Sequence, residues 1–308
     1  MTFRSSPSFN GVGFRCYAVC VEPGPVTYTE LALPSIPYTS LGHCVCGRRN
    51  RPKKFARHEK FPWVAKLVRK NDQELFCSAS LISNKYLISA AHCFSTSLGT
   101  QIPGNIQVIL NELPADSRLK TAPPAFKRNV VQITRYLNLG SAFETDADIA
   151  LIKLEKAIEL DNESIVPVCL PKGENRSLHF QGTKALLSQW VWDSEWKAHQ
   201  LMNVRSTVVN NDVCSSVYKN NIQFTTKTSS KGLMCAKPNI PGFCHTISGG
   251  ALMSMDDSGR YSKYTQIGVG TWGNDCQMGR DLPLIYTRVT ETINWILLNT
   301  QDSSYCLP

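Results

Sequence analysis

Three residues of the sequence, His92, Asp148 and Ser248, have side chains that could together perform nucleophilic catalysis. A serine hydroxyl becomes a useful nucleophile when a neutral imidazole accepts its proton and a carboxylate holds that imidazole in the required tautomer. In this chemistry Ser248 is the nucleophile, His92 is the general base and Asp148 orients His92. Each residue also has a purely structural alternative. His92 could be a histidine of the core, Asp148 could cap a strand, and Ser248 could be a turn residue before two glycines.

The sequence around these residues predicts short β-strands, which must hold them in position. From Phe61 onward the chain is made of short apolar or alternating runs separated by turn residues, which is typical of an all-β sandwich or barrel. The clearest runs are residues 63–68, 80–89, 106–110, 148–154 and 266–272. Near the end, Val289, Ile293, Ile296 and Leu297 recur at helical spacing and predict one amphipathic terminal helix.

The order His92, Asp148, Ser248 and the residues that flank them resemble the chymotrypsin/trypsin family of serine proteases. The resemblance covers about residues 55–300. It implies an all-β fold of two six-stranded antiparallel β-barrels (trypsin-like) with a C-terminal α-helix, and catalytic groups in the cleft between the barrels. Further landmarks lie at residues 61–63, 168–171, 270–273, 285–289 and 295–296.

The composition divides the chain into an N-terminal flank, residues 1–54, and a trypsin-like serine protease domain, residues 55–308. The flank contains cysteines and several prolines, and it leads into a basic tract from Arg48 to Lys60. This tract carries a local net charge of +6, out of +9 for the whole chain. It could bind a polyanion such as heparin, serve as a processing site, or be a solvated linker. Its basic residues are Arg48, Arg49, Arg51, Lys53, Lys54, Arg57 and Lys60.

The cysteine content indicates an oxidising compartment. A chain of 308 residues with 12 cysteines usually pairs them, so we expect a secreted, disulfide-bonded protein. The alternative is a reducing compartment with zinc ligands or free thiols, but the sequence has no Cys-x-x-Cys or His-Glu-x-x-His spacing. Glycosylation sequons at Asn162 and Asn175 also fit secretion. No apolar run is long enough to span a membrane, and no signal peptide is recognisable in the first thirty residues.

The family resemblance also implies a set of disulfide bonds. It pairs Cys77 with Cys93, Cys214 with Cys235, Cys244 with Cys276, and Cys169 with either Cys44 or Cys46. One bridge that is common in the family is missing, and its two positions fall on Ala185 and Ser254. The connectivity of Cys16, Cys20, Cys306 and the remaining member of the Cys44/Cys46 pair is left open.

Two positions depart from what the family needs for activation and for transition-state stabilisation. Active relatives insert a newly cut Ile-Val-Gly-Gly-like terminus and pair its ammonium with an aspartate just before the serine. This chain has Ile247 there and no such terminus between residues 49 and 58. Thr246 replaces the glycine whose N–H faces the developing oxyanion, and the loss of one such donor costs about 10² to 10³ in rate.

The primary specificity pocket is altered as well. The resemblance assigns it to Gly242, Thr271, Trp272, Gly273 and Leu284. Gly242 stands where trypsin has an aspartate, and Leu284 replaces a glycine that keeps the pocket open. Leu284 is therefore expected to plug the pocket.

These observations favour a secreted protease homologue that is inactive or impaired and acts as a binding or regulatory module for extracellular proteins of a proteolytic cascade. The alternative is an active serine endopeptidase of narrow, non-tryptic specificity that uses His92, Asp148 and Ser248. A third reading is a polyanion-binding protein that uses the basic tract. We expect no cofactor, no metal, no membrane span and no nucleic-acid partner.

Overall fold

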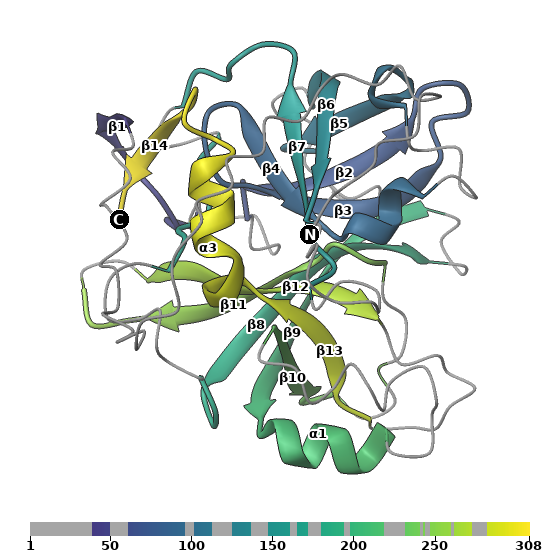
Figure 1. Ribbon diagram of the computed structural model, residues 1–308, viewed down its shortest axis with the longest axis vertical. Coiled ribbons are helices and arrows are strands. Elements are labelled where there is room, and N and C mark those ends of the chain that lie inside the picture. Colours follow the sequence, from purple (N-terminus) through teal and green to yellow (C-terminus); the bar gives the residue numbers. More distant parts are fainter. Residues whose placement is uncertain are drawn as a thin grey trace, which may run out of the picture. The chain divides into compact units, whose positions relative to one another are not determined.

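The fold was analysed in a computed structural model of the chain (Figure 1). The chain divides into two compact units, Met1–Ile36 and Pro37–Pro308, and every described residue lies in the second unit. The structure describes residues 39–49, 61–95, 102–112, 125–136, 147–160, 165–171, 180–193, 198–218, 232–240, 243, 247–259, 262–272 and 282–308.

The first half of the domain is a closed antiparallel barrel of six strands in the order β2-β3-β4-β7-β6-β5. Its interior is filled by apolar side chains such as Leu67, Leu87, Val108 and Ile152, which are almost fully buried. The strands are β2 (Val64–Arg69), β3 (Leu75–Leu81), β4 (Tyr86–Ser89), β5 (Ile106–Leu110), β6 (Phe126–Arg135) and β7 (Ala150–Leu154).

The second half is a second closed barrel of six strands, in the order β10-β13-β12-β11-β8-β9. Leu187, Val204, Leu252 and Ile267 pack inside it. The strands are β8 (Lys184–Asp193), β9 (Ala198–Val209), β10 (Leu233–Pro238), β11 (Ala251–Asp256), β12 (Lys263–Trp272) and β13 (Leu284–Arg288). The two barrels confirm the fold class that the sequence predicted.

The described helices are short and few. They are η1 (Ala91–Phe94), η3 (Pro103–Asn105), α1 (Asn211–Tyr218) and α3 (Val289–Leu298). In α3, Val289, Ile293 and Ile296 are buried while Leu298 is exposed, so the expected amphipathic terminal helix is present. No helix among the described residues has the length and apolar character that crossing a bilayer requires.

The segment 39–49, which the composition placed in the N-terminal flank, packs on the two-barrel domain. Its strand β1 (Thr39–Val45) pairs in parallel with β14 (Ser304–Leu307), which follows α3. Gly47 has φ +67 and is so close to Tyr264 and Cys169 that a Cβ atom would overlap them. The boundary at residue 54 itself lies outside the described residues, but the compact unit begins before β1.

Two disulfide bonds hold this segment in place. Cys46 bonds Cys169 between the barrels, which decides between the two partners that the sequence left open. Cys44 bonds Cys306 in β14, a pairing that the sequence could not indicate. The segment before the basic tract is therefore covalently attached to both the middle and the end of the domain.

The two positions of the disulfide bond that is common in the family but absent here lie opposite each other on neighbouring strands. Ala185 in β8 is paired in register with Ser254 in β11. Directly opposed residues have Cα atoms about 4.5 to 5.5 Å apart, which is within the range of a disulfide bond. Both halves of the bridge have thus been replaced at one intact site.

We expect the double variant Ala185→Cys/Ser254→Cys to form this disulfide and to stabilise the domain by about 2 to 4 kcal/mol. The thermal midpoint should rise by about 5 to 10 °C under oxidising conditions. Thermal unfolding of the double variant is compared with that of each single cysteine variant. A double variant that forms the bond without any rise would contradict the prediction.

Candidate active site

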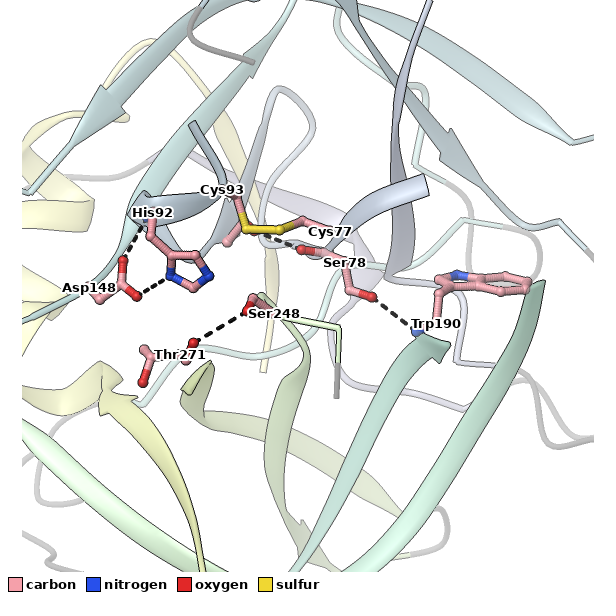
Figure 2. The surroundings of a disulfide bond; sticks show 9 residues. Cys77, Ser78, His92, Cys93, Asp148, Trp190, Ser248 and Thr271 are labelled. Atoms are coloured by element: carbon pink, nitrogen blue, oxygen red, sulfur yellow. Dashed lines mark hydrogen bonds and ion pairs between the residues drawn. A yellow bond between two sulfur atoms is a disulfide. The ribbon is translucent and has the colours of Figure 1, made fainter. Parts of the chain in front are cut away.

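The imidazole of His92 and the carboxylate of Asp148 form a close pair. His92 lies in η1, and its Nδ1 is 2.5 Å from Oδ2 of Asp148, just before β7 (Figure 2). The other carboxylate oxygen accepts the backbone N–H of His92 at 2.9 Å. A proton on Nδ1 satisfies this pair, and in a neutral imidazole it makes Nε2 the basic nitrogen. This is the tautomer that a general base beside a serine requires.

Asp148 is itself held from the second barrel. Its backbone N–H donates to Oγ1 of Thr287 at 3.0 Å, and the Thr287 hydroxyl donates to the Asp148 carbonyl oxygen at 3.1 Å. Thr287 is fully buried in β13. The backbone of the residue that orients His92 is therefore held by the second barrel.

Ser248 sits in a tightly anchored turn before β11. Its carbonyl oxygen accepts the N–H of Ser78 at 2.8 Å, and the next N–H, that of Gly249, donates to the Gly270 carbonyl oxygen at 2.7 Å. Gly249 has φ +86, and a Cβ atom there would overlap the Ser78 carbonyl oxygen and the Ser89 hydroxyl. A glycine is required both for the backbone angle and for the close approach.

The hydroxyl of Ser248 is hydrogen-bonded to a backbone carbonyl oxygen. It donates to the Thr271 carbonyl oxygen at 3.3 Å, and the ring of His92 lies between Asp148 and Ser248 without a hydrogen bond to the serine (Figure 2). A hydroxyl has only one proton to donate, so in this arrangement that proton is not aimed at His92. The structure thus brings the three predicted residues together without forming the serine-to-histidine hydrogen bond.

Two of the degenerate positions have apolar surroundings. Ile247 packs against the apolar cluster that includes the first-barrel core. Leu284 is 2% exposed and belongs to the core cluster of the second barrel, against which Phe243 also packs. Thr246, Gly242 and Gly273 lie outside the described residues, as does the side chain of Trp272. The oxyanion hole and the base of the pocket therefore stay predictions.

A buried cation links the two barrels near Ser248. The ammonium of Lys66 in β2 lies 4.1 Å from the ring centroid of Trp190 in β8 and 2.5 Å from Oε2 of Glu112. Burial lowers the pKa of Lys66, and Glu112 opposes this shift by stabilising the charged form. The backbone N–H of Trp190 donates to Oγ of Ser78, the residue that also holds the Ser248 carbonyl (Figure 2).

The remaining disulfides follow the pattern that the resemblance implied. Cys77 in β3 bonds Cys93 directly after His92, and so fixes η1 to the first barrel. Cys214 in α1 bonds Cys235 in β10. Cys244 and Cys276 lie outside the described residues, so their pairing stays a prediction.

Two buried tyrosines near this region provide a test of the packing. Tyr286 in β13 is fully buried and its hydroxyl has no hydrogen-bond partner among the described residues, whereas the Tyr218 hydroxyl donates to the Pro283 carbonyl oxygen at 2.6 Å. Burial raises the pKa of both phenols, that of Tyr218 to about 12.

We expect Tyr286→Phe to leave the free energy of unfolding unchanged or to raise it by up to about 1 kcal/mol. Tyr218→Phe should lower it by about 1 kcal/mol, as measured by urea unfolding. Equal losses in both variants would contradict this.

The sequence alone did not reveal the residues that hold the strands around the site in place. Ser78, Thr287 and Lys66 all act through contacts between strands that are far apart in the chain. Their only sequence signal is a polar residue within an apolar run. That signal does not reveal the partner.

Comparison with known proteins agrees with this geometry. Residues 52–296 match the protein family described as Trypsin. Since this match covers most of the chain, which also forms the two barrels with His92, Asp148 and Ser248 brought together, the chain belongs to the trypsin family.

The individual relatives share between a quarter and a third of their aligned residues with this chain. The chain is 29% identical to Transmembrane protease serine 11A of Homo sapiens, over 78% of this chain and 52% of that protein. It is 26% identical to Coagulation factor XI of Bos taurus, over 96% of this chain and 46% of that protein. It is 27% identical to Transmembrane protease serine 9 of Rattus norvegicus, over 86% of this chain and 23% of that protein. The chain thus spans about half of the first two relatives and less of the third.

Proposed function

We propose that this chain is an extracellular trypsin-like protease homologue with absent or strongly impaired peptidase activity. It acts as a binding or regulatory module in a proteolytic cascade. The observation that carries this proposal is the apolar packing of Ile247. An inserted terminal ammonium would meet no carboxylate at this position, and an unpaired buried charge is strongly unfavourable. The route by which active relatives assemble their site is therefore closed to this chain.

Two further observations support impairment through separate steps. Leu284 stands where the family resemblance expects a glycine that keeps the pocket open, and its larger side chain should leave less room for the side chain of a substrate. The Ser248 hydroxyl donates to Thr271, so its proton must be redirected before His92 can accept it. Defects in activation, binding and proton transfer act on different steps, and their effects on rate should roughly multiply.

The second candidate is an active endopeptidase of narrow, non-tryptic specificity. It is supported by the 2.5 Å contact between His92 and Asp148, which is well formed. In this reading the Ser248 hydroxyl rotates toward His92 when a substrate binds, since catalytic hydrogen bonds often tighten only in complexes.

The extracellular setting is supported by the four disulfides of the described residues and by the similarity to a coagulation factor. In this setting we further propose glycosylation at Asn162 and Asn175, and binding of a polyanion by the basic tract Arg48–Lys60.

A fluorophosphonate probe tests the proposal directly. We expect no labelling of Ser248 above that of Ser248→Ala, and no hydrolysis of arginyl, lysyl or aromatic peptide esters. Ser248→Ala should keep the thermal midpoint and the affinity for any partner, because a partly exposed hydroxyl contributes little to stability. Turnover that disappears in Ser248→Ala would establish the second candidate instead.

A further inference from the structure

Three exposed cations gather on the outer face of the second barrel. Lys184 in β8 and Lys237 in β10 are each paired in register with Thr207 in β9, so the three residues form one row across adjacent strands. Arg205 lies two residues along β9 on the same outward side. Lys184, Arg205 and Lys237 are all exposed, and β8, β9 and β10 lie side by side (Figure 1).

Within the part of the chain that the structure describes, no carboxylate forms an ion pair with these three charges. Some other cations among the described residues do pair with carboxylates, for example Lys66 with Glu112 and Lys153 with Asp302. Lys184, Arg205 and Lys237 take part in no ion pair formed by the described residues. On the neighbouring strand β11, Asp256 stands opposite Lys263 of β12 in the strand register. The row therefore presents a concentrated positive charge to solvent.

The spacing of the row suits a chain of anionic groups. Neighbouring strands lie about 4.8 Å apart, so the two lysines stand about 10 Å from each other across Thr207. Asn239 accepts the Thr207 hydroxyl through its side-chain oxygen at 3.4 Å, which leaves its amide NH2 group to donate to a ligand. Two ammonium groups, a guanidinium and a neutral donor thus face the same way.

We propose that the outer face formed by Lys184, Arg205 and Lys237, which we name the β8–β10 patch, binds a sulfated polysaccharide. No aromatic side chain stands among the outward positions of the described parts of β8, β9 and β10 around the row, so stacking of nucleic-acid bases has no platform there. The choice of a polysaccharide over a nucleic acid rests on the extracellular setting in the proposed function. The patch shares no residue with the basic tract.

The test uses heparin as the probe and three charge-matched triple variants of the full chain. The patch variant carries Lys184→Gln, Arg205→Gln and Lys237→Gln. The control variant carries Lys127→Gln, Arg135→Gln and Lys156→Gln, which are exposed cations of the first barrel. The tract variant carries Arg51→Gln, Lys53→Gln and Lys54→Gln. Heparin Kd is measured over a range of salt concentrations, and thermal unfolding establishes that each variant is folded.

We expect the patch variant to bind heparin at least tenfold more weakly and to lower the slope of log Kd against log salt by about 2 to 3. The control variant should change Kd less than threefold. Equal losses in the patch and control variants would mean that net charge alone attracts heparin, and would overturn the proposal. A loss confined to the tract variant would overturn it too.

Two further arms define the ligand and separate this proposal from the proposed function. Desulfated heparin should bind far more weakly than heparin, and single-stranded DNA that binds more tightly than heparin would overturn the choice of ligand. Labelling of Ser248 is measured on the same variants, so a finding of peptidase activity would end the proposed function without altering the heparin result. Appearance of the full-length protein in culture medium tests the extracellular setting separately.

Discussion

Fluorophosphonate labelling of Ser248 is expected to appear only when four missing features are restored together. These features are Thr246→Gly, Ile247→Asp, Leu284→Gly and an Ile-Val-Gly-Gly terminus released by cleavage near Arg49. Thr246→Gly alone should do little, because the serine turn still lacks the buried ion pair that active relatives form on cleavage. Restoring the oxyanion donor in the complete variant should contribute about 10² to 10³ to the labelling rate.

The structure also predicts the cost of this repair. Ile247→Asp alone would place a carboxylate against an apolar cluster and should destabilise the domain. Leu284→Gly removes a side chain from the core of the second barrel, and such truncations cost about 2 to 5 kcal/mol. Labelling rates and thermal midpoints are measured for the single, double and complete variants. Labelling of the unmodified protein at a rate comparable to that of the complete variant would show that the diagnosis of the site is wrong.

Gly249→Ala is expected to be the most damaging single substitution beside the site. Gly249 combines φ +86 with a position where a Cβ atom would overlap the Ser78 carbonyl oxygen and the Ser89 hydroxyl. Relief of this overlap would break the hydrogen bond from Ser78 to the Ser248 carbonyl. We expect a loss of more than about 3 kcal/mol in the free energy of unfolding, measured by denaturant titration.

Gly182 provides a matched control for this prediction. It has a similar backbone angle, φ +75, but nothing lies within 4 Å of a Cβ atom built there. Gly182→Ala should therefore cost only the backbone strain, about 1 kcal/mol. Similar losses in the two variants would mean that the contact with β3 does not determine the requirement for glycine at position 249.

The two barrels could be predicted because the family resemblance implied them and because several of their strands are marked by local patterns. The alternating and apolar runs that end at turn residues became β2, β5, β7 and β12, and the apolar spacing after residue 288 became α3. The convergence of His92, Asp148 and Ser248 could be predicted because their flanking residues are typical of the family. Three of the implied disulfides, those of Cys77, Cys214 and Cys169, are present for the same reason.

The parts that could not be predicted depend on contacts between distant segments. The strand β1 has glycine, serine and histidine among its residues, so it has little intrinsic strand signal and exists because β14 pairs with it. Nothing local indicates that Cys306 meets Cys44, because the two are 262 positions apart. The direction of the Ser248 hydroxyl is a single torsion, which a list of residue types does not determine. The row of cations on β8, β9 and β10 also depends on strand register.

The bond between Cys44 and Cys306 turns the domain into a covalent ring. Because it joins the first described strand to the last, the backbone from one cysteine to the other is a closed loop. A single peptide-bond cleavage anywhere in this loop, including the basic tract after Arg49, opens the ring without releasing a piece. The products of one cut would migrate as one species until the disulfides are reduced, and cleavage would be seen as a new terminus and the mass of one added water. A single cut could release a separate polypeptide only outside the ring, unless the disulfides are reduced.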